Sequence, residues 1–281
     1  MTAVVSDVVT ALERAYPPEL AEPWDAVGLV CGDPDESVDT ALICVDPTEA
    51  TVREAIERGA GLLVAHHPLL LRGVHGIPAN DPKGRLVHRL VRNNVALLCA
   101  HTNADSADPG VSDALAEALG LSVTGPLTPS ENGRTGLGRV AELPAAEPFA
   151  VFLRRVADAV PATEPGVRGA GDPDRPIRTV AVCGGAGDSF LDAAIAAGVD
   201  AYVTADLRHH PASEHLERGA NVPALVDVTH WASEWPWCEQ AARVIRAELA
   251  GTVDVLVSTR RTDPWTLRAG GAPVDSGRSP Q

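Results

Sequence analysis

The chain has few aromatic residues, a single lysine and no pair of cysteines spaced C-x-x-C. Aromatic residues make up 4% of the 281 residues, and Lys83 is the only lysine among 23 basic residues. Without paired spacing, the cysteines do not indicate a cysteine zinc site or a disulfide framework. We expect reduced and mostly buried thiols at all five positions: Cys31, Cys44, Cys99, Cys183 and Cys238.

Excess positive charge and long apolar runs are also missing. The formal net charge is −15, whereas proteins that grip nucleic acid need a basic surface, so we expect no direct nucleic-acid binding and disfavour a DNA-binding adaptor. A nucleotide substrate stays compatible, because a bound dication supplies local positive charge. No apolar run approaches the roughly 18 residues that span a membrane, and the first residues lack the form of a signal peptide. We therefore expect a cytoplasmic protein without membrane contact.

What the sequence does contain is an alternation of continuous apolar runs with helical patterns. This alternation predicts an α/β fold with mixed sheets covered by helices on both faces. Helices are expected at residues 6–16, from the Asp46 cap to Gly59, and at 86–91, 112–119, 148–160 and 235–249. Loops are expected at residues 121–137 and 161–176, and a last strand at 252–258. We predict one domain over residues 1–259, followed by a disordered tail at 260–281.

Within this domain one pattern is written twice, 139 positions apart. In both copies a strand leads to a helix, a closing glycine and a second apolar strand. Without any gap, Cys44 aligns with Cys183, Gly59 with Gly198, and Val64 with Val203. The domain therefore divides into repeat one (residues 1–120), a connecting segment (121–177) and repeat two (178–259).

Each repeat then closes a buried strand with a histidine and, four residues later, a carboxylate. In α/β sheets, sites lie beyond the carboxyl ends of the strands, and this spacing lets both side chains converge where a strand turns into a helix. The alternatives are helix capping by the carboxylate and structural, hydrogen-bonded histidines. Adding the histidine pair that follows the strand at residues 62–65, the candidates are His66, His67, His101, Asp105, His230 and Glu234.

Imidazole and carboxylate ligands without thiolate suit Zn, Mn, Fe, Co or Ni. Three histidines and two carboxylates suit a pair of ions roughly 3.5–4 Å apart that share one carboxylate. We therefore expect two divalent ions per chain. Asp206, His209 and His210 are weaker candidates, for which surface positions are the alternative. The glycine-rich run at residues 184–187 follows a strand as a phosphate loop does, but it lacks the lysine of such loops.

Taken together, these blocks resemble the Nif-three-like family, whose members are also known as homologues of type 2 GTP cyclohydrolase I. The matching blocks span nearly the whole chain and lie at residues 22–29, 65–68, 101–105, 204–210 and 227–234. The resemblance implies two intertwined α/β repeats, a dinuclear metal site and a ring-shaped homohexamer. It also implies the ligand set His66, His67, Asp105, His230 and Glu234, with Glu234 bridging.

The first functional hypothesis is a metal-dependent hydrolase with a small-molecule substrate. As the resemblance implies, the reaction is hydrolytic opening of the guanine ring of GTP by metal-activated water, which releases formate. His101 is the candidate for proton transfer, because an imidazole titrates near neutral pH. Two alternatives stay open: a metal-dependent phosphoesterase, and a non-enzymatic metal-binding regulator, chaperone or interaction scaffold.

Overall fold

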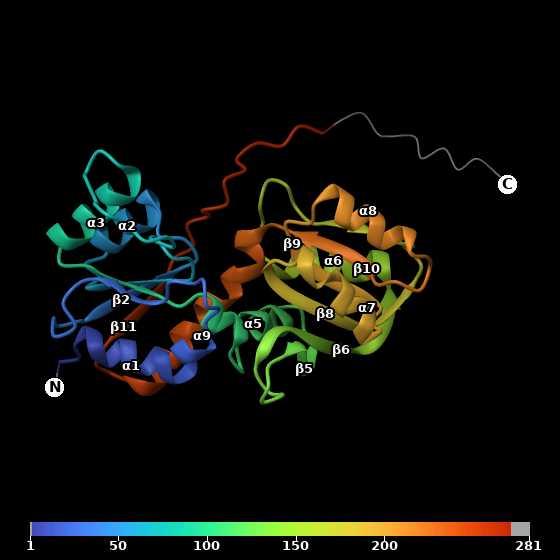
Figure 1. Ribbon diagram of the computed structural model, residues 1–281, viewed down its shortest axis with the longest axis horizontal. Helices are drawn as coiled ribbons and strands as arrows, with labels where there is room; N and C mark the ends of the chain where they lie inside the picture. Colours follow the sequence, from blue (N-terminus) through green and yellow to red (C-terminus); the bar gives the residue numbers. More distant parts are fainter. Residues whose placement is uncertain (1, 271–281) are drawn as a thin grey trace.

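The computed structural model describes residues 2–270 and consists of two mixed β-sheets flanked by helices (Figure 1). The first sheet has five strands in the order β1-β4-β3-β2-β11, and the second has six in the order β5-β6-β8-β9-β10-β7. The prediction of an α/β fold with mixed sheets covered by helices is confirmed. Within the described residues, no helix is both long enough and apolar enough to cross a bilayer.

The first sheet is built on three parallel strands, β2 (Thr40–Cys44), β3 (Leu62–Ala65) and β4 (Ala96–Cys99). The edge strand β1 (Gly28–Cys31) is antiparallel to β4, and β11 (Asp254–Val257) is parallel to β2. Helices α2 (Glu49–Glu57) and α3 (Pro82–Arg92) cover one face, while α1 (Val5–Ala15) and α9 (His230–Glu248) cover the other.

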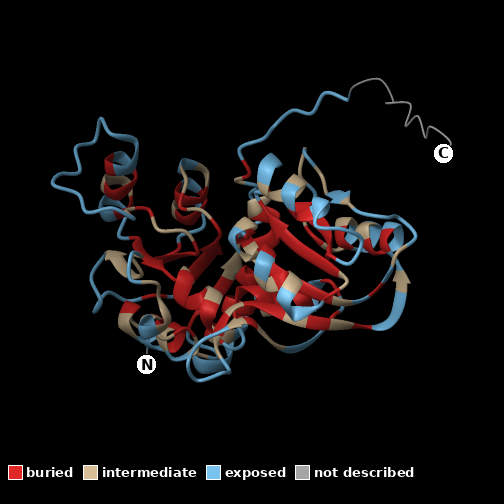
Figure 2. Ribbon diagram, turned by 45° about the vertical axis from the view of Figure 1, so that its right-hand side comes forward, coloured by how far each residue is buried: buried red, intermediate tan, exposed pale blue. Residues whose placement is uncertain are grey.

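The strands are apolar on both sides because both faces are covered. Leu42 and Leu63 pack towards α2 and α3, whereas Ile43 and Val64 pack in the core beneath α1 and α9. Figure 2 shows the strands buried and the outer faces of the helices exposed.

The second sheet repeats this plan with β8 (Pro176–Ala186), β9 (Ala201–Ala205) and β10 (Ala224–Val228) in parallel. Three antiparallel strands complete it: β5 (Ser122–Pro129), β6 (Gly136–Pro148) and β7 (Arg168–Ala170). Four further helices belong to this half or join it to the first: α5 (Val111–Ala118), α6 (Phe149–Ala159), α7 (Leu191–Ala197) and α8 (His209–Glu217). Two short 3-10 turns lie at Pro18–Leu20 and Asp188–Phe190.

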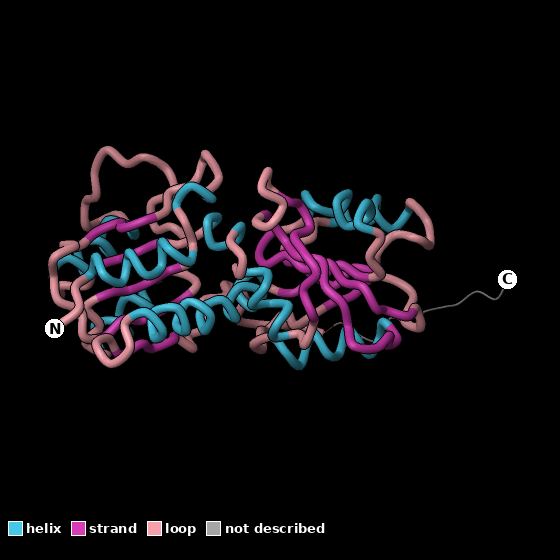
Figure 3. Tube along the Cα trace, turned by 90° about the horizontal axis from the view of Figure 1, so that it is seen from below, coloured by secondary structure: helices cyan, strands magenta, loops and turns pink. Residues whose placement is uncertain are grey.

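The two halves are intertwined through α9. This helix begins directly after β10 of the second sheet, and the chain then returns to add β11 to the first sheet. Trp237 of α9 is fully buried and packs on Tyr16 of the first half, with ring centroids 5.8 Å apart. Figure 3 shows the strands in two groups joined by helices. The last strand therefore belongs to the first sheet, although it follows repeat two in the sequence.

Residues 121–137 are not the loop that their glycine, proline, serine and threonine content predicts. They form the edge strand β5 and the start of β6, and Pro126 and Pro129 are tolerated because an edge strand has one unpaired side. Residues 161–176 likewise include β7. The connecting segment therefore builds half of the second sheet.

Two further sequence expectations meet a different arrangement. Helix α2 is capped by the Thr48 hydroxyl, which accepts from the Thr51 amide, and not by Asp46. Residues 260–270 contain no helix or strand, yet Asp263 is buried and Thr262 donates a hydrogen bond to Asp46. The predicted disordered tail thus begins with a packed segment, and residues 271–281 lie outside the described residues.

Candidate metal centre

Four histidines and two carboxylates converge where the two sheets meet. His66 and His67 directly follow β3, and His101 follows β4 at the start of α4 (Thr102–Ser106). From the second half, His230 opens α9 directly after β10, and Glu234 lies one turn further along that helix. The strand ends predicted from sequence are therefore brought together, and both halves contribute.

Glu234 occupies the middle of this cluster. Its Oε1 lies 3.5 Å from His66 Nε2 and 3.0 Å from His230 Nε2, and its Oε2 lies 3.1 Å from His67 Nε2. Asp105 Oδ1 lies 3.7 Å from His66 Nε2. Glu234 Oε1 thus faces His66 and His230, and Oε2 faces His67, so this one carboxylate contacts three of the four imidazoles.

Each imidazole is oriented through its other ring nitrogen. His66 Nδ1 bonds to Ala100 O at 2.9 Å, and His67 Nδ1 bonds to Asp46 Oδ1 at 2.7 Å. His101 Nδ1 bonds to Asp25 Oδ1 at 2.9 Å, and His230 Nδ1 bonds to Asp206 Oδ2 at 2.7 Å. Metal-bound histidines use such outer partners to fix the ring and the tautomer. Because each ring donates its Nδ1–H to a carbonyl or carboxylate oxygen, each neutral ring carries its lone pair on Nε2, on the side away from that acceptor.

Lone pairs consequently face one another at the centre. His67 Nε2 and His230 Nε2 lie 3.2 Å apart, and both lie against Glu234. His66 Nε2 and Glu234 Oε2 are buried and have no hydrogen-bond partner among the described residues. Buried polar atoms without partners are costly, so this arrangement requires positive charge between them, either protons or cations. Two overlapping groups, His66-His67-His101 and His67-His230-Glu234, have ligand atoms close enough to hold an ion.

The pKa values without ions express the same requirement. Burial, the largest single effect, disfavours the charged forms of His67 and His230. Glu234, acting together with Asp46 on His67 and with Asp206 on His230, outweighs burial and raises the two pKa values to about 10 and about 11. Burial also opposes ionisation of Glu234, but the imidazoles around it hold its pKa well below the usual range. Burial raises the pKa of Asp105 to about 6. The cluster therefore takes up protons in place of cations.

His101 differs from the other three rings because its pKa is lowered, by burial and by the neighbouring His66. Asp25 fixes this ring and also accepts from the Thr102 amide and hydroxyl, at 3.0 Å and 2.5 Å. The ring lies beside the cluster and lines a cavity of about 500 Å³ that reaches Asp105, His230 and Glu234. The His101 ring is placed where it could exchange a proton with a molecule in the cavity, and it could also serve as a further imidazole ligand of an ion.

The outer carboxylates were partly missed by the sequence reasoning. The local sequence favours a helix cap at Asp46, but this residue follows β2, the strand paired in parallel with the one that precedes His66 and His67. A carboxylate at a neighbouring strand end is the signal that identifies it. Asp206 has a left-handed backbone, with φ of 57°, and aligns with His67 in the repeat. Its hydrogen bond to His230 makes it part of the site.

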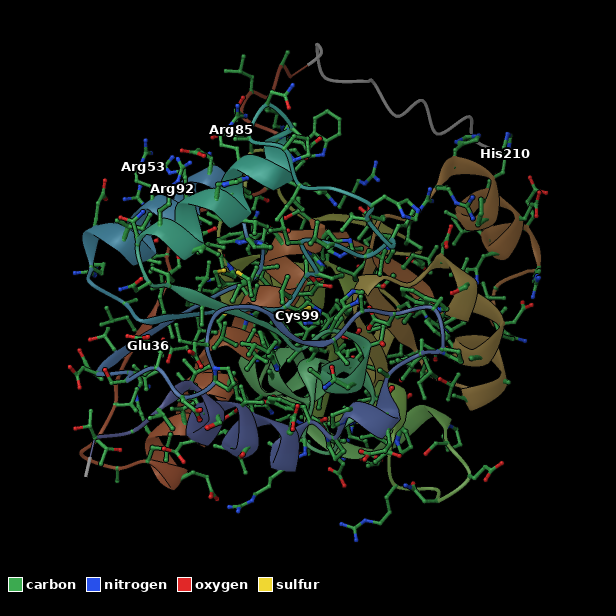
Figure 4. All side chains as sticks on the ribbon, turned by 60° about the vertical axis from the view of Figure 1, so that its left-hand side comes forward. Glu36, Arg53, Arg85, Arg92, Cys99 and His210 are labelled. Atoms are coloured by element: carbon green, nitrogen blue, oxygen red, sulfur yellow. The ribbon has the colours of Figure 1, made fainter. Side chains whose placement is uncertain are left out.

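The remaining polar candidates lie outside the cluster or are already hydrogen-bonded within the protein. His209 and His210 open α8 and are exposed, and Figure 4 shows His210 at the outer surface, apart from the buried Cys99. The amides of Gly184 and Gly185 donate to the hydroxyls of Ser112 and Ser233, at 3.3 Å and 2.9 Å. These two amides are therefore not available to a phosphate. Four of the five cysteines are buried and Cys31 is partly buried, and all five are free thiols.

Comparison with known proteins gives consistent matches over nearly the whole chain. The model of the family described as Duf34/NIF3 (NGG1p interacting factor 3) matches residues 3–264. A Streptomyces coelicolor protein named GTP cyclohydrolase 1 type 2 homolog is 52% identical, over 97% of each chain. A Mycobacterium tuberculosis protein of the same name is 41% identical, over 95% of this chain and 98% of its own. The crystal structure of the Staphylococcus aureus hypothetical protein SA1388 superposes with a TM-score of 0.86 at 27% identity, over 95% of this chain and 100% of that one.

Proposed function

Since this chain belongs to the Duf34/NIF3 family, we propose that it is a dinuclear metal-dependent hydrolase that opens a heterocyclic ring. The guanine imidazole ring of GTP is the substrate that the relatives' name suggests. The observation that carries the proposal is the set of four oriented imidazoles beside Glu234, in which His66 Nε2 and Glu234 Oε2 are buried without a hydrogen-bond partner among the described residues.

The ligands in this proposal are His66, Asp105 and Glu234 for one ion, and His67, His230 and Glu234 for the other. Divalent cations bound here would supply Lewis-acid chemistry, which activates water and stabilises developing negative charge. His101 would accept or deliver a proton at Nε2, and Asp25 would hold its tautomer by keeping the proton on Nδ1. The adjoining cavity gives a small substrate access to His101 and to the ligands Asp105, His230 and Glu234.

Metal analysis with a bridging-ligand variant tests the site. We expect two divalent ions per chain in the wild type. In Glu234→Gln at least one ion is lost, with a decrease in affinity larger than the roughly 10–100-fold that follows removal of an outer partner. The control is Glu239→Gln, an exposed acid on the same helix that pairs with Arg246 at 3.6 Å. Retention of both ions in Glu234→Gln would contradict the proposed ligand set.

A hydrolysis assay tests the reaction. Metal-loaded protein is expected to release formate from a guanine nucleotide, and His101→Ala is expected to reduce that rate at least 100-fold, as for a general acid–base residue. Turnover of phosphoesters without formate release would support the phosphoesterase instead. Two bound ions with turnover of neither class would support the non-enzymatic scaffold.

The homohexamer and the cytoplasmic location expected from the sequence belong to the same proposal. Size-exclusion chromatography with light scattering measures the assembly directly. A measured mass that differs from that of six chains would contradict the homohexamer.

A further inference from the structure

We propose that the cavity beside His101 binds a planar, uncharged heterocycle of the nucleobase class through Trp24, and that no side chain of the cavity wall binds a polyphosphate chain. The inference deepens the proposed function, on which it rests, by defining the substrate class. Of the two cavities that reach His230, this one also exposes Asp105 and Glu234. Its volume of about 500 Å³ lies within the range of small-molecule sites.

Two aromatic side chains stand in the walls of this cavity, Trp24 and Phe190. Trp24 is 58% exposed, which is unusual for so large an apolar side chain. Its ring meets His101 edge-on, with centroids 6.0 Å apart and an interplanar angle of 76°. An indole face left open beside the reacting groups is a stacking surface for a flat ring.

The position of Trp24 is fixed by its neighbours on both sides. The Glu22 amide donates to the Thr102 hydroxyl at 2.9 Å, and Asp25 bonds to His101 and Thr102. The loop that carries the indole is thus tied to the start of α4. A ring stacked on Trp24 would be held at a defined place relative to His101 and Asp105.

The side chains of the cavity provide no cation for a phosphate chain. No lysine or arginine of the described chain lines it, and Glu22 adds an acid that lies outside the proposed ligand set. The glycine amides in its wall are already bonded to Ser112 and Ser233. Phosphates in proteins are recognised by arginine, lysine or free backbone amides, and this wall offers neither basic side chain nor the amides of Gly184 and Gly185.

The neighbouring cavity does not provide a cation for a phosphate chain either. Arg168 lines that cavity, but its guanidinium pairs with Asp227 at 2.5 Å, and Asp206 and Asp263 add negative charge. A triphosphate in that cavity would meet these carboxylates and a guanidinium that is already paired. The heterocycle is therefore the part of a nucleotide that this chain is built to recognise.

Binding of guanosine and GTP to the metal-free, full-length protein tests this, measured by isothermal titration calorimetry, since bound ions would themselves attract the phosphates. We expect the two dissociation constants to agree within about threefold. Trp24→Ala should weaken both by about tenfold, the size of one stacked base, and Trp24→Phe should restore most of the loss. Trp265→Ala is the matched control, since Trp265 is 64% exposed and lines the neighbouring cavity.

Three results would overturn the inference: GTP binding tenfold tighter than guanosine, unchanged affinity in Trp24→Ala, or no binding of guanosine. Thermal unfolding of Trp24→Ala confirms that the exposed substitution leaves the fold intact. If guanosine binds through Trp24 and is not hydrolysed, the proposed function fails and the ring site stands. If GTP is hydrolysed while guanosine does not bind, the ring site fails alone.

Discussion

At the scale of single residues, the glycines beside Glu234 matter as much as the ligands. Gly185 has a φ of +71°, and a Cβ built on it would lie 2.5 Å from Glu234 Oε1 and 3.3 Å from His230 Nε2. Glu234 is almost fully buried and cannot swing away. The glycine-rich run therefore serves close approach of the backbone to the bridging carboxylate, rather than phosphate binding.

We predict that Gly185→Ala displaces Glu234 and lowers zinc affinity at least tenfold, as measured by competition with a chelating dye. The matched control is Gly198→Ala, because Gly198 has nearly the same φ, +67°, but no atom lies within 4 Å of its built Cβ. Both variants bear the strain of a left-handed alanine, about 1–2 kcal/mol. Overpacking adds about 1–3 kcal/mol only in Gly185→Ala. Equal zinc affinities in the two variants would refute the steric argument.

At the scale of elements, the segment that follows β11 connects the end of the described chain to the centre. The Thr262 hydroxyl donates to Asp46 Oδ2, and Asp46 Oδ1 bonds to His67 Nδ1. Before it reaches Thr262, the segment is anchored by Ser258, whose hydroxyl donates to the buried Glu54 at 2.6 Å. A stretch without helix or strand thus supports a predicted metal ligand through one intermediate carboxylate.

Removing the hydrogen bond from Thr262 to Asp46 should weaken zinc binding measurably without abolishing it. Thr262→Val deletes one hydrogen bond, worth about 0.5–1.5 kcal/mol, so zinc affinity should fall about two- to tenfold. Thr266→Val provides the comparison, since Thr266 is exposed on the same segment. Identical zinc titrations for the two variants would show that the segment only covers the surface.

At the scale of the whole molecule, the centre joins the two halves, so its protonation affects global stability. His67 has a pKa raised from 6.5 to about 10 by Glu234, against the opposing effect of burial. The folded metal-free protein therefore holds this proton more tightly than the unfolded chain. The resulting stabilisation is complete below the unfolded pKa and is lost as the pH rises through about 10.

We predict that the metal-free protein loses stability from about pH 6.5 to about pH 10, measured by urea unfolding in the presence of a chelator. Buried thiols contribute in the same direction, so the informative quantity is the difference from His67→Asn, which should show a shallower decline. Zinc binding should strengthen over the same range, because ions compete with protons for the imidazoles. Parallel pH profiles for the wild type and His67→Asn would exclude this coupling.

The sequence by itself determined the buried parallel strands and the residue types at their carboxyl ends. Apolar runs that end in His66-His67, His101 and His230 specify buried strands with ligands at their carboxyl ends, because strand position and residue type are local properties. The 139-residue repeat likewise indicated the duplicated plan. These inferences needed only periodicity, spacing and the ligand preferences of imidazole and carboxylate.

Only the tertiary structure decided how the halves meet. Sheet pairing sends β11 back to the first sheet and makes residues 122–129 an edge strand, although their composition is that of a loop. It also places Asp46 on His67 and Thr262 on Asp46, contacts that join residues 21 and 216 positions apart. Such contacts depend on long-range packing, which local composition does not encode. The physical reason is that a strand's partners, unlike its own conformation, are selected by the burial of the whole molecule.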